Sequence, residues 1–167
     1  MIIAGVGARA RATPQEIVAA VLDCCSRNGI EPGEVAMLAG LDRYETLAAL
    51  RAAVDMLDAA LSAARGHPGA DIAGDGAPMG DGDRIVGDSF SSNVGVKFLA
   101  FSVAKLQLEA SRCATHSQRS LIATGVPSVA EAAALAAAGP EGMLLAPRVA
   151  FATVTVALAI GPGATEP

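Results

Sequence analysis

The chain has 167 residues, a length typical of one domain with a substantial hydrophobic core. Its formal net charge is −5, its pI is about 4.9, and only 3% of its residues are aromatic. Nucleic-acid-binding domains are usually basic and often stack bases on aromatic rings, so this composition argues against that class. The three cysteines show no metal-ligand spacing and leave an odd thiol, which favours reduced thiols in a cytoplasmic protein without a metal.

The mean hydropathy is positive, at +0.45, so the longest apolar stretch has to be tested as a membrane span. That stretch, residues 143–160, contains Pro147, Arg148 and two threonines, and its second half alternates. These features are poor for a transmembrane helix and favour a buried strand. Residues 1–7 are too short for the apolar part of a signal peptide, and positive charges follow them instead of preceding them. We therefore expect no membrane partner.

The N-terminal segment predicts a strand followed by a helix. Residues 2–6 are apolar and form a short buried strand that ends at Gly7. The helix begins at residues 13–16, Thr-Pro-Gln-Glu, because this is a capping box with proline at the first helical position. Asn28 and Gly29 end the helix, since glycine adopts the left-handed conformation of a C-terminal cap at little cost.

A second strand and helix are predicted over residues 35–61. Residues 35–39 form the strand, and Asp42 with Glu45 forms another capping box. The helix repeats its apolar residues at intervals of three and four, which places them on one stripe: Leu47, Leu50, Val54, Leu57 and Leu61.

From about residue 65 to residue 95 the composition changes to Gly and Asp, with few large apolar residues. Such a segment cannot bury enough surface to offset its ordering entropy, so we predict a flexible insertion. Within it, residues 81–83, Asp-Gly-Asp, lack the acid spacing and bidentate Glu of a calcium-binding EF-hand loop.

The next part of the chain predicts two short strands and two helices. Residues 96–101 form a strand, and Ser102 caps the helix that follows. Residues 121–123 are apolar and predict a second short strand. Residues 128–131, Ser-Val-Ala-Glu, are a third capping box, and the helix they begin ends at Gly139.

The last strand is predicted over about residues 150–160, after an apolar lead at 143–145. Its large apolar side chains fall on one face and its threonines and alanines on the other. Strands that alternate with helices imply a sheet covered by helices on both faces. The sequence therefore predicts one α/β domain over residues 1–167, a three-layer α/β/α sandwich around a mixed sheet of about five strands.

The strongest local indication of a ligand site is the segment 5–11, which runs out of the first strand toward a helix. Gly5 and Gly7 would let the backbone approach a ligand, and free N–H groups at a helix start attract anions. Arg9 and Arg11 add two positive charges to a chain that is acidic overall, and guanidinium groups bind carboxylates in bidentate fashion. The alternative interpretation is a strand end with two solvated arginines.

The same segment is a weak dinucleotide-binding fingerprint. The third glycine of that motif falls at Ala10, which can be tolerated. However, no acidic residue ends the second strand at the usual distance unless Asp42 takes that role. A nucleotide-binding domain therefore stays a more distant alternative.

A second candidate segment, residues 124–131, follows a predicted strand, where open α/β sheets bind ligands. Gly125, Ser128 and Glu131 are its candidate residues, although a turn and a helix cap alone would also explain them. A nucleophilic serine is a poor hypothesis, because neither histidine stands in a suitable context and no carboxylate pair has acid–base spacing. From the residues alone, the chain is a small anion-binding α/β domain without a cofactor.

Four segments in this order resemble the family that joins CobE to the C-terminal part of CbiG, proteins of cobalamin biosynthesis. They cover nearly the whole chain except the insertion, and residues 126–135, Val-Pro-Ser-Val-Ala-Glu-Ala-Ala-Ala-Leu, are the most specific part. Two positions depart from the family pattern: Ala8 replaces the usual cysteine, and Arg148 stands where lysine is common. The matching segments are 5–9, 38–42, 125–135, and 144–148 leading into 153–157.

The resemblance implies a role in corrin-ring assembly. In CbiG, the two-part protein opens the δ-lactone of a cobalt-precorrin with loss of acetaldehyde during ring contraction. This chain is similar to the C-terminal part alone, which exists as the free-standing CobE in the aerobic pathway. Precorrins carry many carboxylates, which suit a glycine loop with arginines and helix N-termini at the strand ends. The substrate-binding residues implied are Gly5, Gly7, Arg9, Arg11, Gly125, Ser128, Glu131 and Arg148.

Two classes of function remain at this point. The domain binds and hands on a precorrin or related corrinoid without chemistry, or it is a hydrolase acting on the δ-lactone, with Glu131 or Asp42 as acid–base candidates. We favour the first class, because convergent donors are present and a nucleophile–base pair is absent. The sequence leaves open whether the domain forms a homodimer or docks on other corrin-pathway enzymes.

Overall fold

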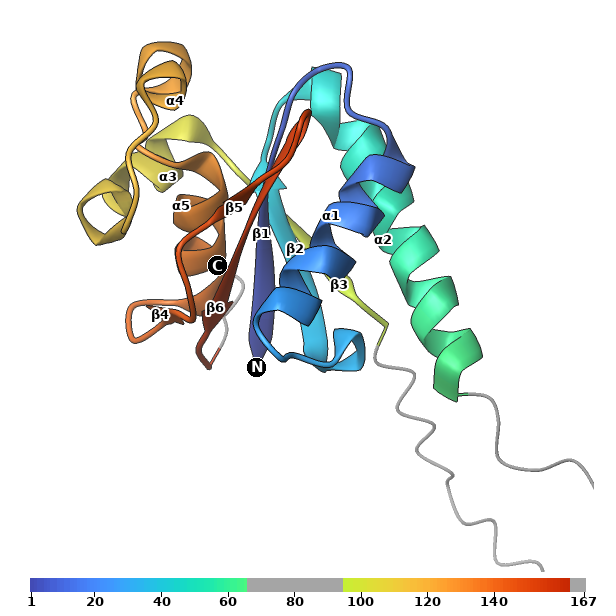
Figure 1. Ribbon diagram of the computed structural model, residues 1–167. Helices are drawn as coiled ribbons and strands as arrows, with labels where there is room; N and C mark the ends of the chain where they lie inside the picture. The colour runs from blue at the N-terminus through green and yellow to red at the C-terminus, as the bar shows by residue number, and fades with distance from the viewer. Residues whose placement is uncertain (66–94, 163–167) are drawn as a thin grey trace, which may run out of the picture.

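The computed structural model describes residues 1–65 and 95–162 (Figure 1). The insertion predicted at 65–95 therefore lies outside the described residues, apart from its two end positions. The elements are β1 (Ile2–Ala8), α1 (Pro14–Arg27), the 3₁₀ turn η1 (Pro32–Glu34), β2 (Val35–Leu41), α2 (Tyr44–Arg65), β3 (Lys97–Phe101), α3 (Val103–Leu108), the 3₁₀ turn η2 (Ala110–Arg112), α4 (Gln118–Thr124), α5 (Val129–Ala138), β4 (Met143–Leu144), β5 (Val149–Ala150) and β6 (Val154–Ile160).

The strands form one mixed sheet of six strands in the order β3-β2-β1-β6-β4, with β5 also paired to β6. β1, β2 and β3 are parallel, as expected for strands joined through helices. β6 runs antiparallel to β1, β4 and β5. The predicted mixed sheet is confirmed, with six strands in place of about five.

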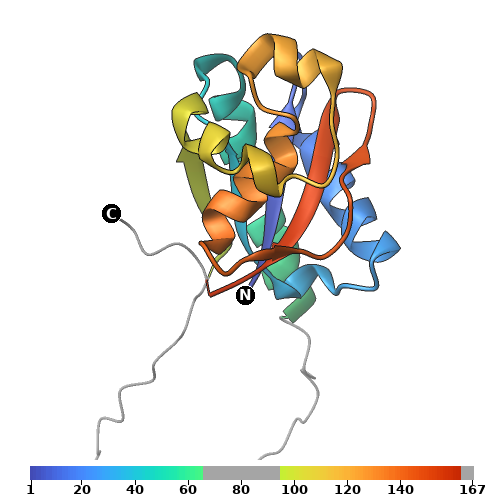
Figure 2. The same cartoon turned by 90° about the vertical axis from the view of Figure 1, so that its left-hand side faces the viewer.

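Helices cover both faces of this sheet, which confirms the three-layer sandwich (Figures 1 and 2). α1 and α2 pack together on one face, and α5 packs on the other against β1, β2 and β6. The two faces of β6 divide as the alternation predicts: Val154, Val156 and Leu158 belong to the core under α1 and α2, and Ala159 to the core under α5.

Short-range caps fix most helix starts at the predicted residues. The Oγ1 of Thr13 accepts a hydrogen bond from the N–H of Glu16 at 3.2 Å, and the Glu16 carboxylate accepts one from the N–H of Thr13 at 2.8 Å. Ser102 and Ser128 cap α3 and α5 through their hydroxyls. Such caps each contribute about 1 kcal/mol to stability.

The predicted strand at 121–123 is wrong, because these residues lie in helix α4. The Ser117 Oγ accepts a hydrogen bond from the N–H of Ser120 at 3.3 Å and so caps the helix. Gly125 ends it with a φ of +69°, in the left-handed region. None of the α4 residues is buried, and Ile122 is 79% exposed. The apolar run at 121–123 therefore does not pack against the sheet as a strand would.

Gly5 gives α5 its position on the sheet. A Cβ at Gly5 would collide with the carbonyl oxygen of Ala130 and would lie 2.5 Å from the N of Ala134. The helix facing it consists almost entirely of small residues, and all of α5 except Val129 is buried. Gly5 was predicted to let the backbone approach a ligand, but in the structure its missing side chain lets α5 pack closely on β1.

The three cysteines are buried and unpaired in these cores. Burial raises the pKa of the Cys25 thiol to about 11, and burial together with the charge of Glu131 raises that of Cys113 to about 11. Among the described helices, no single one is long and apolar enough to cross a bilayer. The pair α4 and α5 reaches that length and composition only together, across a 69° bend.

We expect Gly5→Ala to destabilise the domain by about 3 kcal/mol, because overpacking a rigid contact typically has a cost of this size. The midpoint of urea unfolding, followed by circular dichroism, measures the change. Gly33→Ala is the matched control, since a Cβ at Gly33 meets no atom within 4 Å and its φ is not positive. Equal midpoints for the two variants would show that α5 does not depend on this contact.

We also expect the buried thiols to resist alkylation in the folded protein. At pH 8 a thiol whose pKa is raised from 9.0 to about 11 is ionised roughly a hundredfold less than a free one, and only the thiolate reacts. Mass spectrometry after brief iodoacetamide treatment should show unmodified Cys25 and Cys113. The same treatment in guanidinium chloride should modify both, and rapid modification without denaturant would contradict their burial.

Candidate functional site

A cleft of about 620 Å³ opens where β1 and β2 end, at the carboxyl edge of the parallel strands. Its volume lies within the usual range of small-molecule sites. This position follows the general rule that open α/β sheets bind ligands beyond the carboxyl ends of their strands. The lining residues come from the loop after β1, the start of α2, α4, the first turn of α5, and the segment from 148 to 155.

Much of the cleft wall is apolar. Gly7 at the end of β1 lies next to Val129 and Ala130 in the first turn of α5, and Ala8 also lines the cleft. A Cβ at Gly7 would lie 3.5 Å from the N of Ala130, so the bare glycine leaves this turn open to the cleft. Phe151 also belongs to the lining, but its ring packs against the core under α1, with the Arg27 guanidinium 6.0 Å from the ring centroid. A flat or apolar ligand body therefore finds contact area here.

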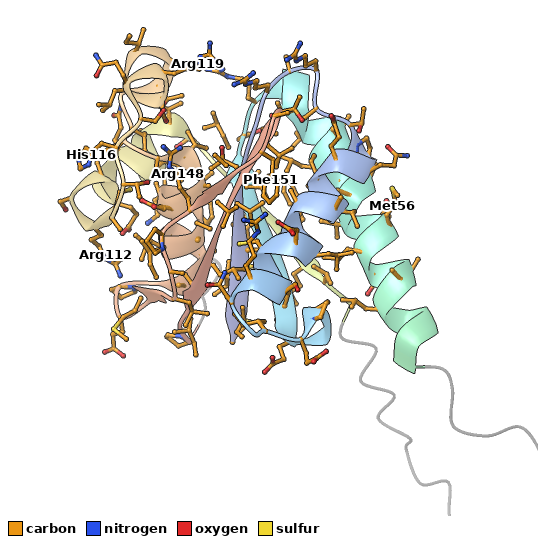
Figure 3. All side chains as sticks on the ribbon, in the orientation of Figure 1. Met56, Arg112, His116, Arg119, Arg148 and Phe151 are labelled. Atoms are coloured by element: carbon orange, nitrogen blue, oxygen red, sulfur yellow. The ribbon has the colours of Figure 1, made fainter. Side chains whose placement is uncertain are left out.

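Four arginines from four separate segments line the same cleft: Arg9, Arg43, Arg119 and Arg148. In Figure 3, Arg119 projects from α4 at the top of the molecule and Arg148 lies beside α5. Among the side chains that the structure describes, the ion pairs are Arg27–Asp23 and Arg112–Glu109, so none of the four cleft arginines has one of these described carboxylates within 4.0 Å. The charges thus remain available to an anionic ligand.

A second hollow of about 440 Å³ adjoins the cleft and carries three arginines. Arg9 and Arg119 line both spaces, and Arg11 lines the hollow with Ala10. Positive charge therefore continues beyond the cleft mouth, over a patch that opposes the acidic character of the whole chain.

Hydroxyl groups complete the polar part of the wall. The Thr46 hydroxyl donates a hydrogen bond to the backbone carbonyl of Arg43 at 3.3 Å, and the Thr124 hydroxyl donates one to the backbone carbonyl of Ser120 at 2.8 Å. The Ser120 Oγ itself is buried and has no hydrogen-bond partner among the described residues. Ser120 lines the cleft, but its hydroxyl is covered by the protein and does not face the open space.

The structure brings together only part of the sequence-predicted site. Gly7, Arg9 and Arg148 line the cleft, and Arg11 lines the adjoining hollow. The remaining candidates lie elsewhere: Gly5 beneath α5, Ser128 buried as the N-cap of α5, Gly125 at the C-terminus of α4, and Asp42 exposed beside the cleft without lining it.

Glu131 is fully buried and does not complete the predicted capping box. Its N–H donates to the Ser128 Oγ at 3.4 Å, but its carboxylate turns to other segments. One oxygen accepts from the N–H of Thr115 at 2.9 Å, and the other accepts from the Thr115 hydroxyl at 2.8 Å and from the N–H of Arg148 at 3.1 Å. Non-local partners therefore outcompete the local cap.

Sequence reasoning missed Arg43, Arg119, Ser120 and Phe151 as cleft residues. Arg43 could have been found, since it follows β2 and parallel strands end at one edge. Arg119 and Ser120 lie in the helix that was predicted as a strand. Nothing local marks Phe151, which stands in the short turn between β5 and β6.

The cleft can hold an anion but offers little acid–base chemistry. Its lining contains arginines and hydroxyls, with no His, Cys, Asp or Glu among the described residues. In the same part of the chain, no three such side chains form a group that could hold a metal ion. His116 lies on the outer side of the α3–α4 layer (Figure 3), and His67 falls outside the described residues.

Comparison with known proteins gives the relatives of this chain. Residues 87–159 match the family described as "Cobalamin synthesis G C-terminus". A Protein CobE from Sinorhizobium sp is 28% identical over 162 residues, which cover 96% of this chain and 80% of that protein.

Two solved structures share the fold. One is CobE, a protein from the cobalamin (vitamin B12) biosynthetic pathway, with a TM-score of 0.71 and 22% identity over 99% of this chain and 93% of that one. The other is the cobalamin biosynthesis protein chiG from Agrobacterium tumefaciens, with a TM-score of 0.61 and 28% identity over 97% and 99%. These findings confirm the resemblance of the chain to the cobalamin-biosynthesis family of CobE and the CbiG C-terminal domain.

Proposed function

We propose that this domain binds a carboxylate-rich, precorrin-type tetrapyrrole in the cleft and acts as an accessory to ring contraction and lactone opening. The observation that carries the proposal is the set of four arginines without carboxylate partners among the described residues, placed around a largely apolar wall. The family relationship supplies the pathway, and the cleft supplies the chemical class of the ligand.

The two parts of such a ligand suit the two parts of the cleft. The macrocycle is broad and largely apolar, which fits the part of the wall formed by Gly7, Ala8 and Val129. Its peripheral carboxylates radiate in several directions, and arginines from four segments surround the space. Guanidinium groups bind carboxylates more strongly than neutral donors do, because the hydrogen bonds are charge-assisted.

Binding without chemistry is favoured over lactone hydrolysis by the surroundings of the two acid–base candidates. All the hydrogen bonds of the Glu131 carboxylate go to Thr115 and Arg148, and the residue is fully buried. Asp42 is exposed and does not line the cleft. A general base has to reach the water or hydroxyl that it activates, and neither carboxylate is placed to do so.

Uroporphyrin, a stable macrocycle with eight carboxylates, is a practical probe of the cleft. Arg9→Ala combined with Arg119→Ala should weaken its binding at least tenfold, because both side chains line the cleft and the adjoining hollow and each charge-assisted hydrogen bond contributes roughly 1.5–3 kcal/mol. Fluorescence titration at fixed ionic strength measures the affinity.

The control removes the same charge elsewhere. Arg51→Ala combined with Lys105→Ala deletes two exposed cations that line neither space, so the affinity should stay within twofold of wild type. Equal losses in both double variants would mean that only net charge matters and would refute the cleft as the binding site. Thermal unfolding of each variant checks that the fold is kept.

Turnover separates binding from hydrolysis. The purified domain incubated with a lactone-bearing precorrin should bind it and release neither ring-opened product nor acetaldehyde. Chromatography of the pigment and an acetaldehyde assay measure the two. Catalytic appearance of either product would establish the hydrolase instead, and a rise in melting temperature with NAD or ATP but not with the precorrin would favour the nucleotide-binding alternative.

A further inference from the structure

The carboxylate of Glu131 stands at the junction of three segments that enclose the cleft. It lies in the first turn of α5, and its partners are Thr115, just before α4, and Arg148, in the connection from β4 to β5. Glu131 is fully buried, and a buried carboxylate is retained only where donors satisfy it. These three donors come from outside its own helix.

The Thr115 hydroxyl connects this carboxylate to the arginine side chain. Its Oγ1 donates to Glu131 at 2.8 Å and accepts a hydrogen bond from the Nε of Arg148 at 2.7 Å. An ionised carboxylate can only accept, so the hydroxyl proton is committed to Glu131 and the oxygen lone pairs face the arginine. The direction of the chain Arg148 to Thr115 to Glu131 is therefore fixed.

This tether distinguishes Arg148 from the other arginines of the cleft. Its Nε and its backbone N–H are both held, while its two terminal amino groups make no hydrogen bond to the described residues. Among the described residues, the arginine side chains that make hydrogen bonds are those of Arg27, Arg112 and Arg148, and the other three cleft arginines are not among them. An arginine held in one orientation loses less side-chain entropy when it binds a ligand.

We propose that Thr115 and Glu131 are positioning residues that hold the Arg148 guanidinium in its ligand-binding orientation. Arg148 then fixes the position of one carboxylate of the ligand, and the three untethered arginines supply general attraction. This inference rests on the proposed function, since the orientation matters only if the cleft receives an anion. The alternative is that the network merely joins three segments of the fold.

Thr115→Val separates the two, because valine keeps the shape of threonine and removes only the hydroxyl. The hydrogen bond from the Thr115 backbone N–H to Glu131 is retained, so the segments stay joined. Thr115→Ser is the matched control, since serine keeps the hydroxyl. If the valine variant does not fold, Thr115→Ala removes the same hydroxyl without the extra methyl group.

The first measurement is solvent exchange of the Arg148 Nε–H by NMR, which requires no ligand. Exchange should be slow in the wild type and in Thr115→Ser, and at least tenfold faster in Thr115→Val. Equal exchange in the valine and serine variants would overturn the tether. Melting temperature is recorded alongside, because a purely structural role would lower stability without this specific signal.

The second measurement is a double-mutant cycle in uroporphyrin affinity. Thr115→Val should weaken binding about fivefold in the wild type, the size of one ordinary hydrogen bond, and should have no further effect in Arg148→Ala. Additive losses would show that Thr115 does not act through Arg148 and would overturn the positioning role. A wild-type domain that does not bind uroporphyrin would refute the proposed function and with it the role in binding, while the Nε–H exchange would still decide whether the tether exists.

Discussion

The close contact between α5 and β1 determines where the cleft of this domain lies. Gly5 and the alanines of α5 let the two backbones come so close that α5 occupies the space that a Cβ at position 5 would need. Packing of this kind is rigid, since the contact involves backbone atoms that cannot move aside. The first turn of α5 is thereby fixed beside the end of β1, next to Gly7, and this junction forms one side of the cleft.

The burial of Glu131 follows from that placement. Once α5 is held on the sheet, its third residue is buried next to Thr115 and Arg148, where an isolated charge would be strongly unfavourable. Three hydrogen bonds from Thr115 and Arg148 satisfy the carboxylate. The requirement to satisfy a buried charge thus joins the irregular segments around the cleft, which otherwise contribute few residues to either core.

Local signals predicted the fold well because they are short in range. The caps at Thr13, Ser102 and Ser128 each involve residues three positions apart, and the structure contains all three. The error at 121–123 has the opposite cause: an apolar triplet fits a strand or a helix equally well, and only the absence of a neighbouring strand decides. Contacts such as Glu131 with Thr115, 16 residues apart, have no local signature, so the sequence could name Glu131 as a candidate but could not reveal its partners.

The same reasoning explains why the cleft was only partly predicted. Gly7 and Arg9 could be predicted as site residues because they lie at the carboxyl end of the first strand, where open α/β sheets bind ligands. The cleft arginines Arg43 and Arg119 belong to other segments, and their convergence depends on the sheet order and on a helix that the sequence misassigned. An acidic chain that nevertheless collects arginines at one sheet edge concentrates its positive potential where an anion can be reached. Since none of the described carboxylates pairs with these arginines, the polyanionic ligand that we propose would supply their counter-charge.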